Sequence, residues 1–247
     1  MNDIKVEGVS LTLQKTEILK NVSIHFEEGK IHGLIGRNGS GKTMLMKCIC
    51  GFVKPTKGSI KVRDKEVGKD MDFPEDVGLI IETPGFVPYY SGYKNLSVLA
   101  GLNRKIGKKE IQEAMQMAGL DPALRRHVGK YSLGMRQRLG IAQAIMENPD
   151  ILILDEPMNG LDKDGVRDMR KLFLELKEQG KTMVIASHSA EDIDILCDTV
   201  HEMDKGVLYP AAQLRYKFDA LSACCGVFDY NIERIVETCL SYKILLL

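Results

Sequence analysis

The stretch Gly36–Thr43 reads GRNGSGKT and matches the phosphate-binding pattern G-x-x-x-x-G-K-[ST] at every fixed position. The apolar run IHGLI precedes it, and the apolar run TMLMKCIC starts at its last residue, so it joins a predicted strand to a predicted helix. Its glycines permit the tight turn in which successive backbone N–H groups point at phosphate oxygens. The helix N-terminus adds its positive end to the same place. The stretch therefore predicts a phosphate-binding loop.

Two side chains of this loop have definite chemical roles. We expect Lys42 to supply a mobile cation to the β- and γ-phosphates of a nucleotide. Thr43 offers a hydroxyl to Mg²⁺, an ion that prefers oxygen ligands. A glycine-rich turn with an incidental lysine is the structural alternative, and the flanking strand and helix argue against it.

Two further apolar strands are expected to end beside this loop. The run ILILD at 151–155 ends on Asp155, which is suited to hold Mg²⁺ directly or through water. Glu156 follows and is placed to accept a proton from an attacking water. The run TMVIAS at 182–187 is followed by His188, which we expect to contact the γ-phosphate. These ends should meet because ligands of open parallel sheets bind at the carboxyl ends of strands.

A fourth apolar strand delivers a second glutamate. The segment Val77–Phe86 reads VGLIIETPGF, so the run GLII leads directly to Glu82. Taken alone, Glu82 is a solvated charge at the end of a strand. Beside the other strand ends, it becomes a fourth strand end aimed at the same phosphate and metal site.

The rest of the chain places these strands in an α/β fold. Continuous apolar strands on both sides of a helix at 163–179 are typical of a parallel sheet covered on both faces. Residues 3–28 alternate as two strands of an antiparallel start, and helical spacing predominates from about 88 to 148. We therefore predict a mostly parallel, mononucleotide-binding core with an N-terminal antiparallel β subdomain and an inserted helical subdomain.

The segment YSLGMRQR at 131–138 opens a strongly amphipathic helix within that insertion. Ser132 and Gly134 give its N-terminus a polar, backbone-exposing character that suits an anion. From these residues alone, a routine helix cap is the better interpretation.

Composition narrows the classes of function. Lysine and arginine number 34 and aspartate and glutamate also 34, so the formal net charge is zero, which argues against a nucleic-acid partner held by a broad basic field. No apolar run approaches the ~18–20 residues that span a bilayer, and MNDIKVEGVS lacks the apolar core of a signal peptide. We expect a cytosolic protein that reaches a membrane only through a partner.

The six cysteines form no C-x-x-C pair, and we expect free reduced thiols that act as small hydrophobes. After Gly206 the chain is less informative. Residues 232–240 show helical spacing, which fits packing against the domain or docking onto a partner.

Together these motifs resemble those of the ABC-type ATPases, over about residues 3–207. GRNGSGKT resembles their Walker A motif, and ILILDEP resembles their Walker B motif followed by the catalytic glutamate. NGLD at 159–162 is similar to their D-loop, and His188 to their switch histidine. YSLGM stands in the place of their LSGGQ signature, with Leu133 and Met135 replacing the first glycine and the glutamine.

The resemblance implies a RecA-like P-loop NTPase that hydrolyses ATP. Glu156 would be the general base, His188 would position the γ-phosphate, and Thr43, Asp155 and Glu82 would hold Mg²⁺. A head-to-tail homodimer, or a pair with another nucleotide-binding subunit, would cover ATP with Ser132 and Gly134 of the opposite subunit. The implied ATP-binding set is Gly36, Arg37, Asn38, Gly39, Ser40, Gly41, Lys42, Thr43, Ser132, Gly134 and Leu13.

Two departures from the family pattern concern Leu13 and Glu82. Aligning ILKNVS with the corresponding run of the family puts Leu13 at the position where the family usually has an aromatic ring. An aliphatic side chain stacks less well on adenine. The family usually has glutamine where this chain has Glu82. The combination of IIETPGF with YSLGM is similar to the bacitracin-resistance and lantibiotic self-protection exporter ATPases.

We therefore expect an ATP-hydrolysing subunit that powers a separate integral membrane permease, for export of a drug, peptide or lantibiotic-like compound. It would lie in the cytoplasm, on the inner face of the membrane, with an ABC-type domain over 3–207 and a C-terminal extension over 208–247. A soluble ABC ATPase in an assembly such as iron–sulfur cluster biogenesis is the first alternative. A non-catalytic nucleotide-gated module and a P-loop kinase fit less well, because they leave Glu156 and His188, or YSLGM and NGLD, without a role.

Overall fold

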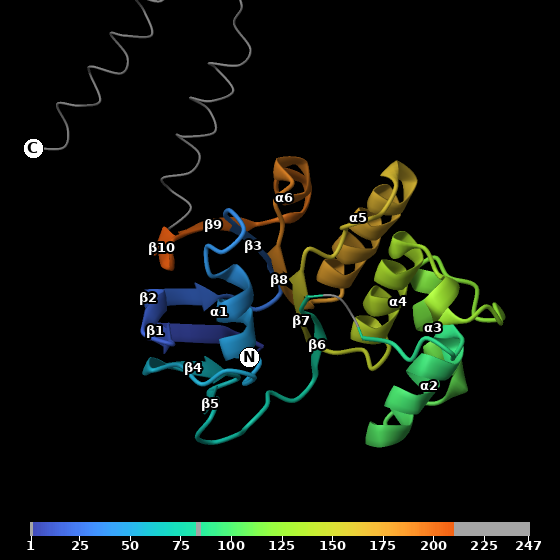
Figure 1. Ribbon diagram of the computed structural model, residues 1–247, viewed down its shortest axis with the longest axis horizontal. Helices are drawn as coiled ribbons and strands as arrows, with labels where there is room; N and C mark the ends of the chain where they lie inside the picture. Colours follow the sequence, from blue (N-terminus) through green and yellow to red (C-terminus); the bar gives the residue numbers. More distant parts are fainter. Residues whose placement is uncertain (1, 83–84, 210–247) are drawn as a thin grey trace, which may run out of the picture. The chain divides into compact units, whose positions relative to one another are not determined.

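The structure is a computed structural model that describes residues 2–82 and 85–209. In these ranges a six-stranded sheet has the order β10-β9-β3-β8-β7-β6, and a four-stranded sheet has the order β2-β1-β4-β5 (Figure 1). The strands are β1 (Ile4–Leu13), β2 (Thr16–Phe26), β3 (Ile31–Ile35), β4 (Lys57–Val62), β5 (Lys65–Glu66), β6 (Val77–Ile80), β7 (Ile151–Asp155), β8 (Thr182–Ala186), β9 (Thr199–Asp204) and β10 (Val207–Tyr209). The helices are α1 (Lys42–Ile49), α2 (Gly92–Asn103), α3 (Lys108–Met117), α4 (Leu133–Ile145), α5 (Lys163–Glu178) and α6 (Ala190–Leu196).

The six-stranded sheet is parallel from β9 through β6, and only β10 runs antiparallel, against β9. Strands β7 and β8 are buried at every position, which is why their sequences are continuous apolar runs rather than alternating ones. The predicted α/β fold with a mostly parallel core is confirmed.

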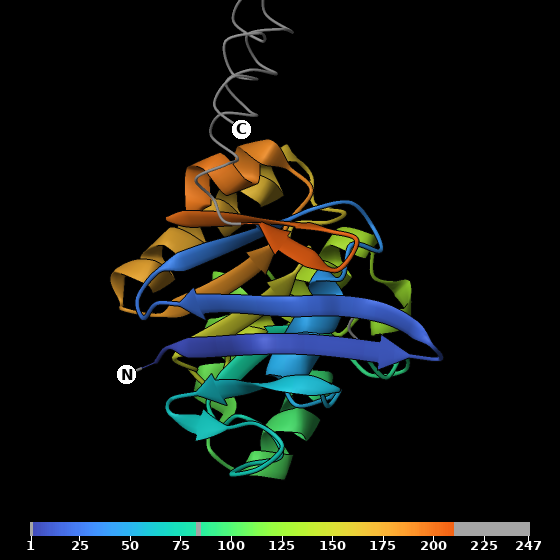
Figure 2. The same ribbon diagram turned by 90° about the vertical axis from the view of Figure 1, so that its left-hand side faces the viewer.

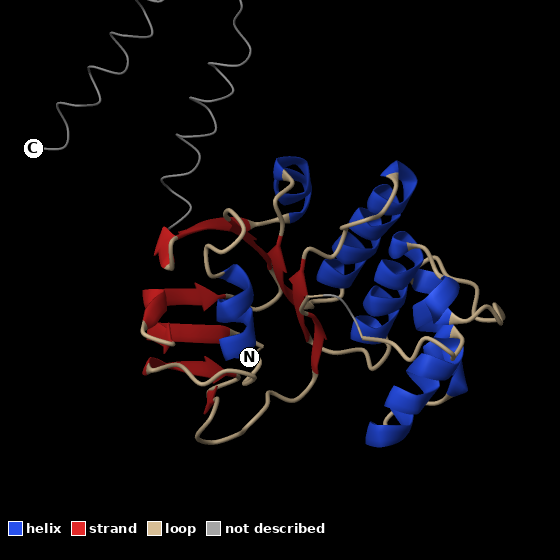
Figure 3. Ribbon diagram, viewed as in Figure 1, coloured by secondary structure: helices blue, strands red, loops and turns tan. Residues whose placement is uncertain are grey.

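The four-stranded sheet is antiparallel and forms a layer of its own. Strands β1 and β2 make a long hairpin, and β4 pairs with the other edge of β1. Helix α1 lies between this layer and the six-stranded sheet, while α4 and α5 cover the opposite face of the six-stranded sheet, with α2 and α3 beyond α4 (Figures 1 and 3). The antiparallel layer faces the viewer in Figure 2.

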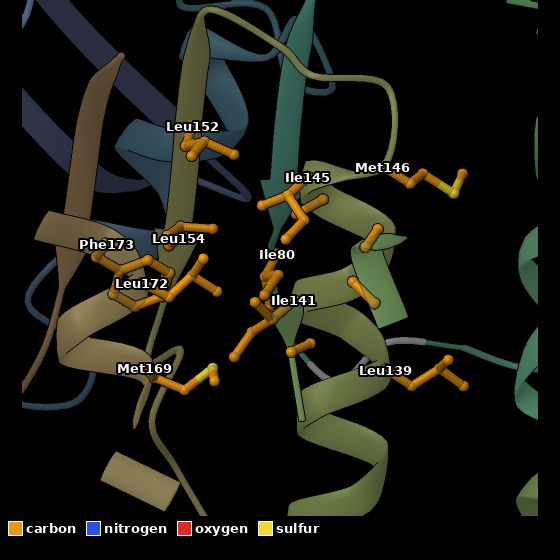
Figure 4. Close-up of a cluster of buried hydrophobic side chains, with 14 of the residues drawn as sticks. Ile80, Leu139, Ile141, Ile145, Met146, Leu152, Leu154, Met169, Leu172 and Phe173 are labelled. Atoms are coloured by element: carbon orange, nitrogen blue, oxygen red, sulfur yellow. The ribbon is translucent and has the colours of Figure 1, made fainter. Parts of the chain in front are cut away.

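Two hydrophobic clusters hold the layers together, one on each face of the parallel sheet. Leu152, Leu154 and Ile185 point to the face covered by α4 and α5, where they join Ile141 and Phe173 (Figure 4). The alternate residues Ile151, Ile153 and Val184 point to the other face and pack with α1 and the antiparallel sheet. Because successive strand residues point to opposite faces, a slip of one residue would exchange the two sets, and the register is therefore tightly specified.

Several expectations need refinement. Strand β6 ends at Ile80, so Glu82 is not the last residue of the strand: it lies two residues beyond, in the left-handed region with φ 62°. Helix α6 and strands β9 and β10 follow β8, where the sequence pattern predicts no element. Three helices, α2, α3 and α4, lie within the segment 88–148 where helical spacing was noted.

Cys48, Cys50 and Cys197 are free thiols, as expected. Burial raises the pKa of Cys48 to about 11 and of Cys50 and Cys197 to about 12, so all three stay protonated and unreactive near neutral pH. The other three cysteines and the helical spacing at 232–240 lie outside the described residues. No helix within residues 2–82 and 85–209 has the length and apolar character needed to cross a bilayer.

The buried His32 and the half-buried His201, on neighbouring strands, predict a loss of stability in mild acid. Burial, with a smaller contribution from the charge of His32, lowers the pKa of His201 to about 4, and burial also lowers the pKa of His32. The unfolded chain takes up protons as the pH falls through about 6.5, while the folded protein resists until lower pH. Stability should thus fall as the pH drops from about 6.5 to about 4, at up to about 1.4 kcal/mol per pH unit for His201, and it is best measured in the window from about pH 6.5 to 5.

Denaturant unfolding of the wild type and of His201→Leu at several pH values measures this effect. The carboxyl groups with lowered pKa values, such as Asp76 and Asp198, lose their contribution at still lower pH and do not interfere. The variant should show a shallower dependence of the free energy of unfolding on pH in that window. An equal slope in both proteins would contradict the assignment to His201.

Candidate nucleotide site

The phosphate-binding loop connects the end of β3 to the start of α1, as its sequence predicts. Gly36 has φ 146°, and a Cβ atom there would lie 2.2 Å from the carbonyl oxygen of Met203. Gly41, with φ 112°, would meet the side chains of Leu19 and Met203 at 3.0 Å. Glycine is therefore required at both ends of the loop, because neither the conformation nor the space admits a side chain.

The loop fits a phosphate group by two observations. Helix α1 begins after Gly41 without a side-chain cap, so its N-terminal N–H groups face the loop. The hydroxyl of Ser40 is buried and has no hydrogen-bond partner among the described residues. A bound phosphate would supply acceptors to both, which is the arrangement expected of an anion site.

Lys42 is buried and folds back over the same loop. Its Nζ donates to the carbonyl oxygen of Gly36 at 2.6 Å and to that of Arg37 at 3.3 Å. These carbonyl groups hold the ammonium above the turn, where a phosphate oxygen can replace them as acceptor. The exposed side chains of Arg37 and Asn38 lie at the rim of the loop.

Thr43 and Asp155 meet although 112 positions separate them. The Thr43 hydroxyl donates to Asp155 Oδ2 at 2.6 Å, which joins the first turn of α1 to the end of β7. A hydroxyl and a carboxylate in contact are suitable donors for Mg²⁺, which needs few protein ligands when phosphate oxygens and water complete its shell. The described residues contain no cluster of three or more His, Cys, Asp or Glu that could hold a metal by themselves.

Glu156 and His188 form the second polar pair of the site. Glu156 Oε2 lies 2.8 Å from His188 Nδ1, and Glu156 has the left-handed φ of 50°. The backbone N–H of Glu156 donates to the Ala186 carbonyl at 2.9 Å, which fixes the start of this turn to β8. Both side chains line a cavity of about 590 Å³, shared with the NGLD segment. The pair is therefore both oriented and accessible.

Glu82 approaches the same region from β6. Its Oε1 accepts from Lys47 Nζ at 2.5 Å, so its carboxylate lies against α1. Sequence reasoning did not single out Lys47, although its position four residues after Thr43 places it on the same side of the helix.

The signature segment opens α4, and Ser132 is its N-cap, accepting from the Met135 N–H at 3.1 Å. The helix-cap interpretation of Ser132 is thus confirmed for the single chain. Leu133 packs over Gly160 of the NGLD segment, where a Cβ atom would lie 2.5 Å from Leu133 Cδ2. A Cβ atom on Gly134 would lie 2.9 Å from the carbonyl oxygen of Gly160. The two segments therefore touch within one chain.

Gln137 is a positioning residue that the sequence did not reveal. It is buried on α4, and its Nε2 donates to the carbonyl oxygens of Glu156 at 3.2 Å and of Pro157 at 2.9 Å. The signature helix thereby holds the backbone that carries Glu156. A polar residue on the buried face of an amphipathic helix was the available signal.

Leu13 ends β1 and is partly exposed, next to the turn at Gln14 and Lys15. The second strand of this hairpin passes beside the phosphate-binding loop, because a Cβ atom on Gly41 would lie 3.3 Å from the Ile18 carbonyl oxygen. Leu13 is therefore at the tip of a hairpin that borders the site.

Comparison with known proteins identifies the family. Residues 19–159 match the family model described as ABC transporter. The chain is 43% identical over 217 residues to the uncharacterized ABC transporter ATP-binding protein YybJ of Bacillus subtilis (strain 168), covering 88% of this chain and 100% of that protein. It is 39% identical to the bacitracin transport ATP-binding protein BcrA of Enterococcus faecalis, over 83% of this chain and 67% of that protein. It is 35% identical to the lantibiotic transport ATP-binding protein SrtF of Streptococcus pyogenes, covering 80% and 85%.

The fold agrees with this relationship. The dimeric structure of MJ0796, a bacterial ABC transporter cassette, superimposes with a TM-score of 0.76 over 84% of this chain and 98% of that one. Its sequence is 23% identical, so this likeness shows the fold alone. On the family match and the identity to its relatives, the chain belongs to the ABC transporter family, as an ATP-binding subunit with ATPase activity.

Proposed function

We propose that this subunit hydrolyses ATP at the edge where β3, β6, β7 and β8 end, with Glu156 as general base. The observation that carries the proposal is the pair of contacts Thr43–Asp155 and Glu156–His188 beside the phosphate-binding loop. One pair is suited to the metal and the other to the attacking water. Residues 36–43 would hold the phosphates through backbone N–H groups and Lys42.

The residues divide the work of an in-line displacement. Glu156 accepts the proton of the water, and His188, bound to it, orients the carboxylate and reaches the γ-phosphate. Thr43, Asp155 and Glu82 would hold Mg²⁺, which would neutralise charge on the phosphates. Lys42 exchanges its carbonyl acceptors for phosphate oxygens. Positioning and charge neutralisation are the main needs of phosphoryl transfer, and this set supplies both.

A second nucleotide-binding subunit completes the site in the proposal, either a second copy of this chain or a related one. Ser132 and Gly134 at the N-terminus of α4 would cover ATP bound to the opposite subunit. The similarity in fold to a dimeric cassette supports such a pair. Leu13, at the hairpin tip, would contact adenine.

The transporter would include an integral membrane permease, and its cargo would be a drug, peptide or lantibiotic-like compound that is exported. Identity to the bacitracin and lantibiotic transport ATP-binding proteins, together with Glu82 in place of glutamine, favours this branch over a soluble assembly. The subunit would lie in the cytoplasm, held to the inner face of the membrane by the permease. The helical segment 88–148 would contact it.

We propose further that residues 3–207 form the ABC-type domain and 208–247 a C-terminal extension. Of that extension, residues 210–247 lie outside the described structure.

Replacing Glu156 by glutamine tests the general base. Glu156→Gln keeps the shape but cannot take a proton, so hydrolysis should fall about a hundredfold or more, with ATP affinity nearly unchanged. Steady-state phosphate release and a fluorescent-nucleotide titration measure the two quantities. Glu178→Gln, at the end of α5, is the matched control and should keep full activity. Undiminished turnover in Glu156→Gln would refute the role.

Replacing Lys42 by alanine tests the phosphate-binding loop. A hydrogen bond to a charged group contributes about 1.5–3 kcal/mol, so ATP affinity should weaken about ten- to a hundredfold. Calorimetric titration gives the affinity, and thermal unfolding verifies that the variant folds. Lys54→Ala, an exposed lysine beyond α1, controls for net charge. If Lys42→Ala bound ATP as well as the wild type, the loop assignment would be wrong.

The contact between Leu133 and Gly160 predicts a rescue. Gly160→Ala adds both the strain of a left-handed alanine, about 1–2 kcal/mol, and overpacking against Leu133, about 1–3 kcal/mol. Gly180→Ala is the matched control, because Gly180 has φ 83° and open space around its Cβ position. Gly160→Ala should lower the free energy of unfolding more than Gly180→Ala does, and the difference is the cost of overpacking against Leu133. Adding Leu133→Ala should restore that difference and no more. Denaturant unfolding measures these free energies. Equal losses in Gly160→Ala and Gly180→Ala would contradict the packing of Leu133 against Gly160.

A further inference from the structure

Glu82 follows β6 at the edge of the sheet where Asp155 and Glu156 end β7. The parallel register ends with Ile80 opposite Leu154, so Glu82 lies two residues past the last paired residue of β6, as Glu156 lies two residues past Leu154. The left-handed backbone at Glu82, with φ 62°, ends the extended course of the chain there. Its carboxylate turns toward α1, where it meets Lys47.

Lys47 is one helical turn beyond Thr43 on α1. Residues four apart on a helix are neighbours on one face, with Cβ atoms about 5–6 Å apart. Thr43 itself contacts Asp155. One face of α1 therefore carries the Thr43 hydroxyl, which is proposed to bind the metal, and one turn later the Lys47 ammonium, which binds Glu82. The side chain of Lys47 is 25% exposed, which places its ammonium at the border of the site rather than in open solvent.

The contact with Lys47 offsets the negative charge that Glu82 brings to the site. A glutamate at this position adds a negative charge beside Asp155, Glu156 and the phosphates of the nucleotide, where glutamine would add none. An unpaired carboxylate would repel the phosphates, and it would compete with them and with water for the metal. A cation bound to Glu82 removes most of that charge while leaving one carboxylate oxygen available.

We propose that Lys47 is a positioning residue that neutralises Glu82 and fixes its carboxylate one turn from Thr43. This inference rests on the proposed role of Glu82 toward the metal and names the residue on which that role depends. Lys47 acts through Glu82 and touches neither ATP nor the attacking water. In this chain the charge of Lys47 offsets the negative charge of Glu82. An uncharged glutamine at position 82 would need no such partner.

The Lys47–Glu82 ion pair contributes little to the stability of the fold, so a change in nucleotide binding can be separated from unfolding. Glu82 is 63% exposed, and ion pairs at such exposure have small effects on stability. Lys47→Met keeps the aliphatic stem and removes the charge, so the variant should unfold at nearly the wild-type temperature. Lys105→Met is the matched control: Lys105 pairs with Asp76 at 3.0 Å, ahead of the same strand β6.

The experiment is a double-mutant cycle of Lys47→Met and Glu82→Gln, with binding of ATP measured in EDTA by titration of a fluorescent analogue. Omitting the metal isolates the repulsion between Glu82 and the phosphates, and gives a readout that does not depend on turnover. Phosphate release with Mg²⁺ is then measured on all four proteins.

Lys47→Met should weaken nucleotide binding about tenfold when Glu82 is present and less than about threefold when residue 82 is glutamine. The ratio of these two effects is the coupling, and kcat/KM in Mg²⁺ should show the same rescue. Lys105→Met should change both quantities by less than twofold.

An equal loss in the Glu82 and Glu82→Gln backgrounds would overturn the proposal, since Lys47 would then act on the nucleotide directly or through the fold. A lowered unfolding temperature of Lys47→Met that Glu82→Gln does not restore would do the same. If Glu82→Gln alone abolished hydrolysis, the proposed ligand role of Glu82 would fail instead, because glutamine also offers an oxygen. The two failures are therefore distinguishable.

Discussion

The parallel register of the four neighbouring strands β3, β8, β7 and β6 is the constraint on which the site depends. Leu34 lies opposite Ala186, Ala186 opposite Asp155, and the neighbouring Leu154 opposite Ile80. A row of backbone hydrogen bonds thus aligns the ends of β3, β8, β7 and β6. The next residues in each chain segment, the phosphate-binding loop, His188, Glu156 and Glu82, must then emerge along one edge. Two separate cores, one on each face, prevent a slip of one residue that would scatter them.

Apart from the hydroxyl of Ser40, the buried polar side chains described at this edge have hydrogen-bond partners in the structure. Lys42 binds carbonyl groups of its own loop, Thr43 binds Asp155, and Glu156 binds His188. The buried Lys42 and Asp155 need such partners, because burial without a hydrogen bond is costly. Each pair also has the donor or acceptor that a nucleotide would use. A nucleotide bound as proposed would exchange these partners for its own donors and acceptors.

The sequence predicted this edge well because its signals are local. A glycine-rich loop between strand and helix, and apolar runs that end on Asp155 and Ser187, need only a few neighbouring residues to be interpreted. Lys47, Gln137 and the contact of Leu133 with Gly160 were missed because each depends on distances between segments far apart in the chain. The end of β6 was misplaced for a related reason: Ile81 continues the apolar run, and only the φ of Glu82 shows where the extended backbone stops. Short elements such as α6 and β10 carry too few residues for a periodic pattern.

Two of the departures from the family pattern, Glu82 and Leu133, are each matched by the residue that they contact. A glutamate stands where glutamine is usual, and a lysine on the adjacent helix lies 2.5 Å from it. A leucine stands where the signature has its first glycine, and Gly160 opposite has no side chain, so the larger residue fits. In each case the added charge or volume meets a neighbour that accepts it, as packed and polar sites require. A residue that looks anomalous in a motif is therefore better judged with the residue it touches than with the motif alone.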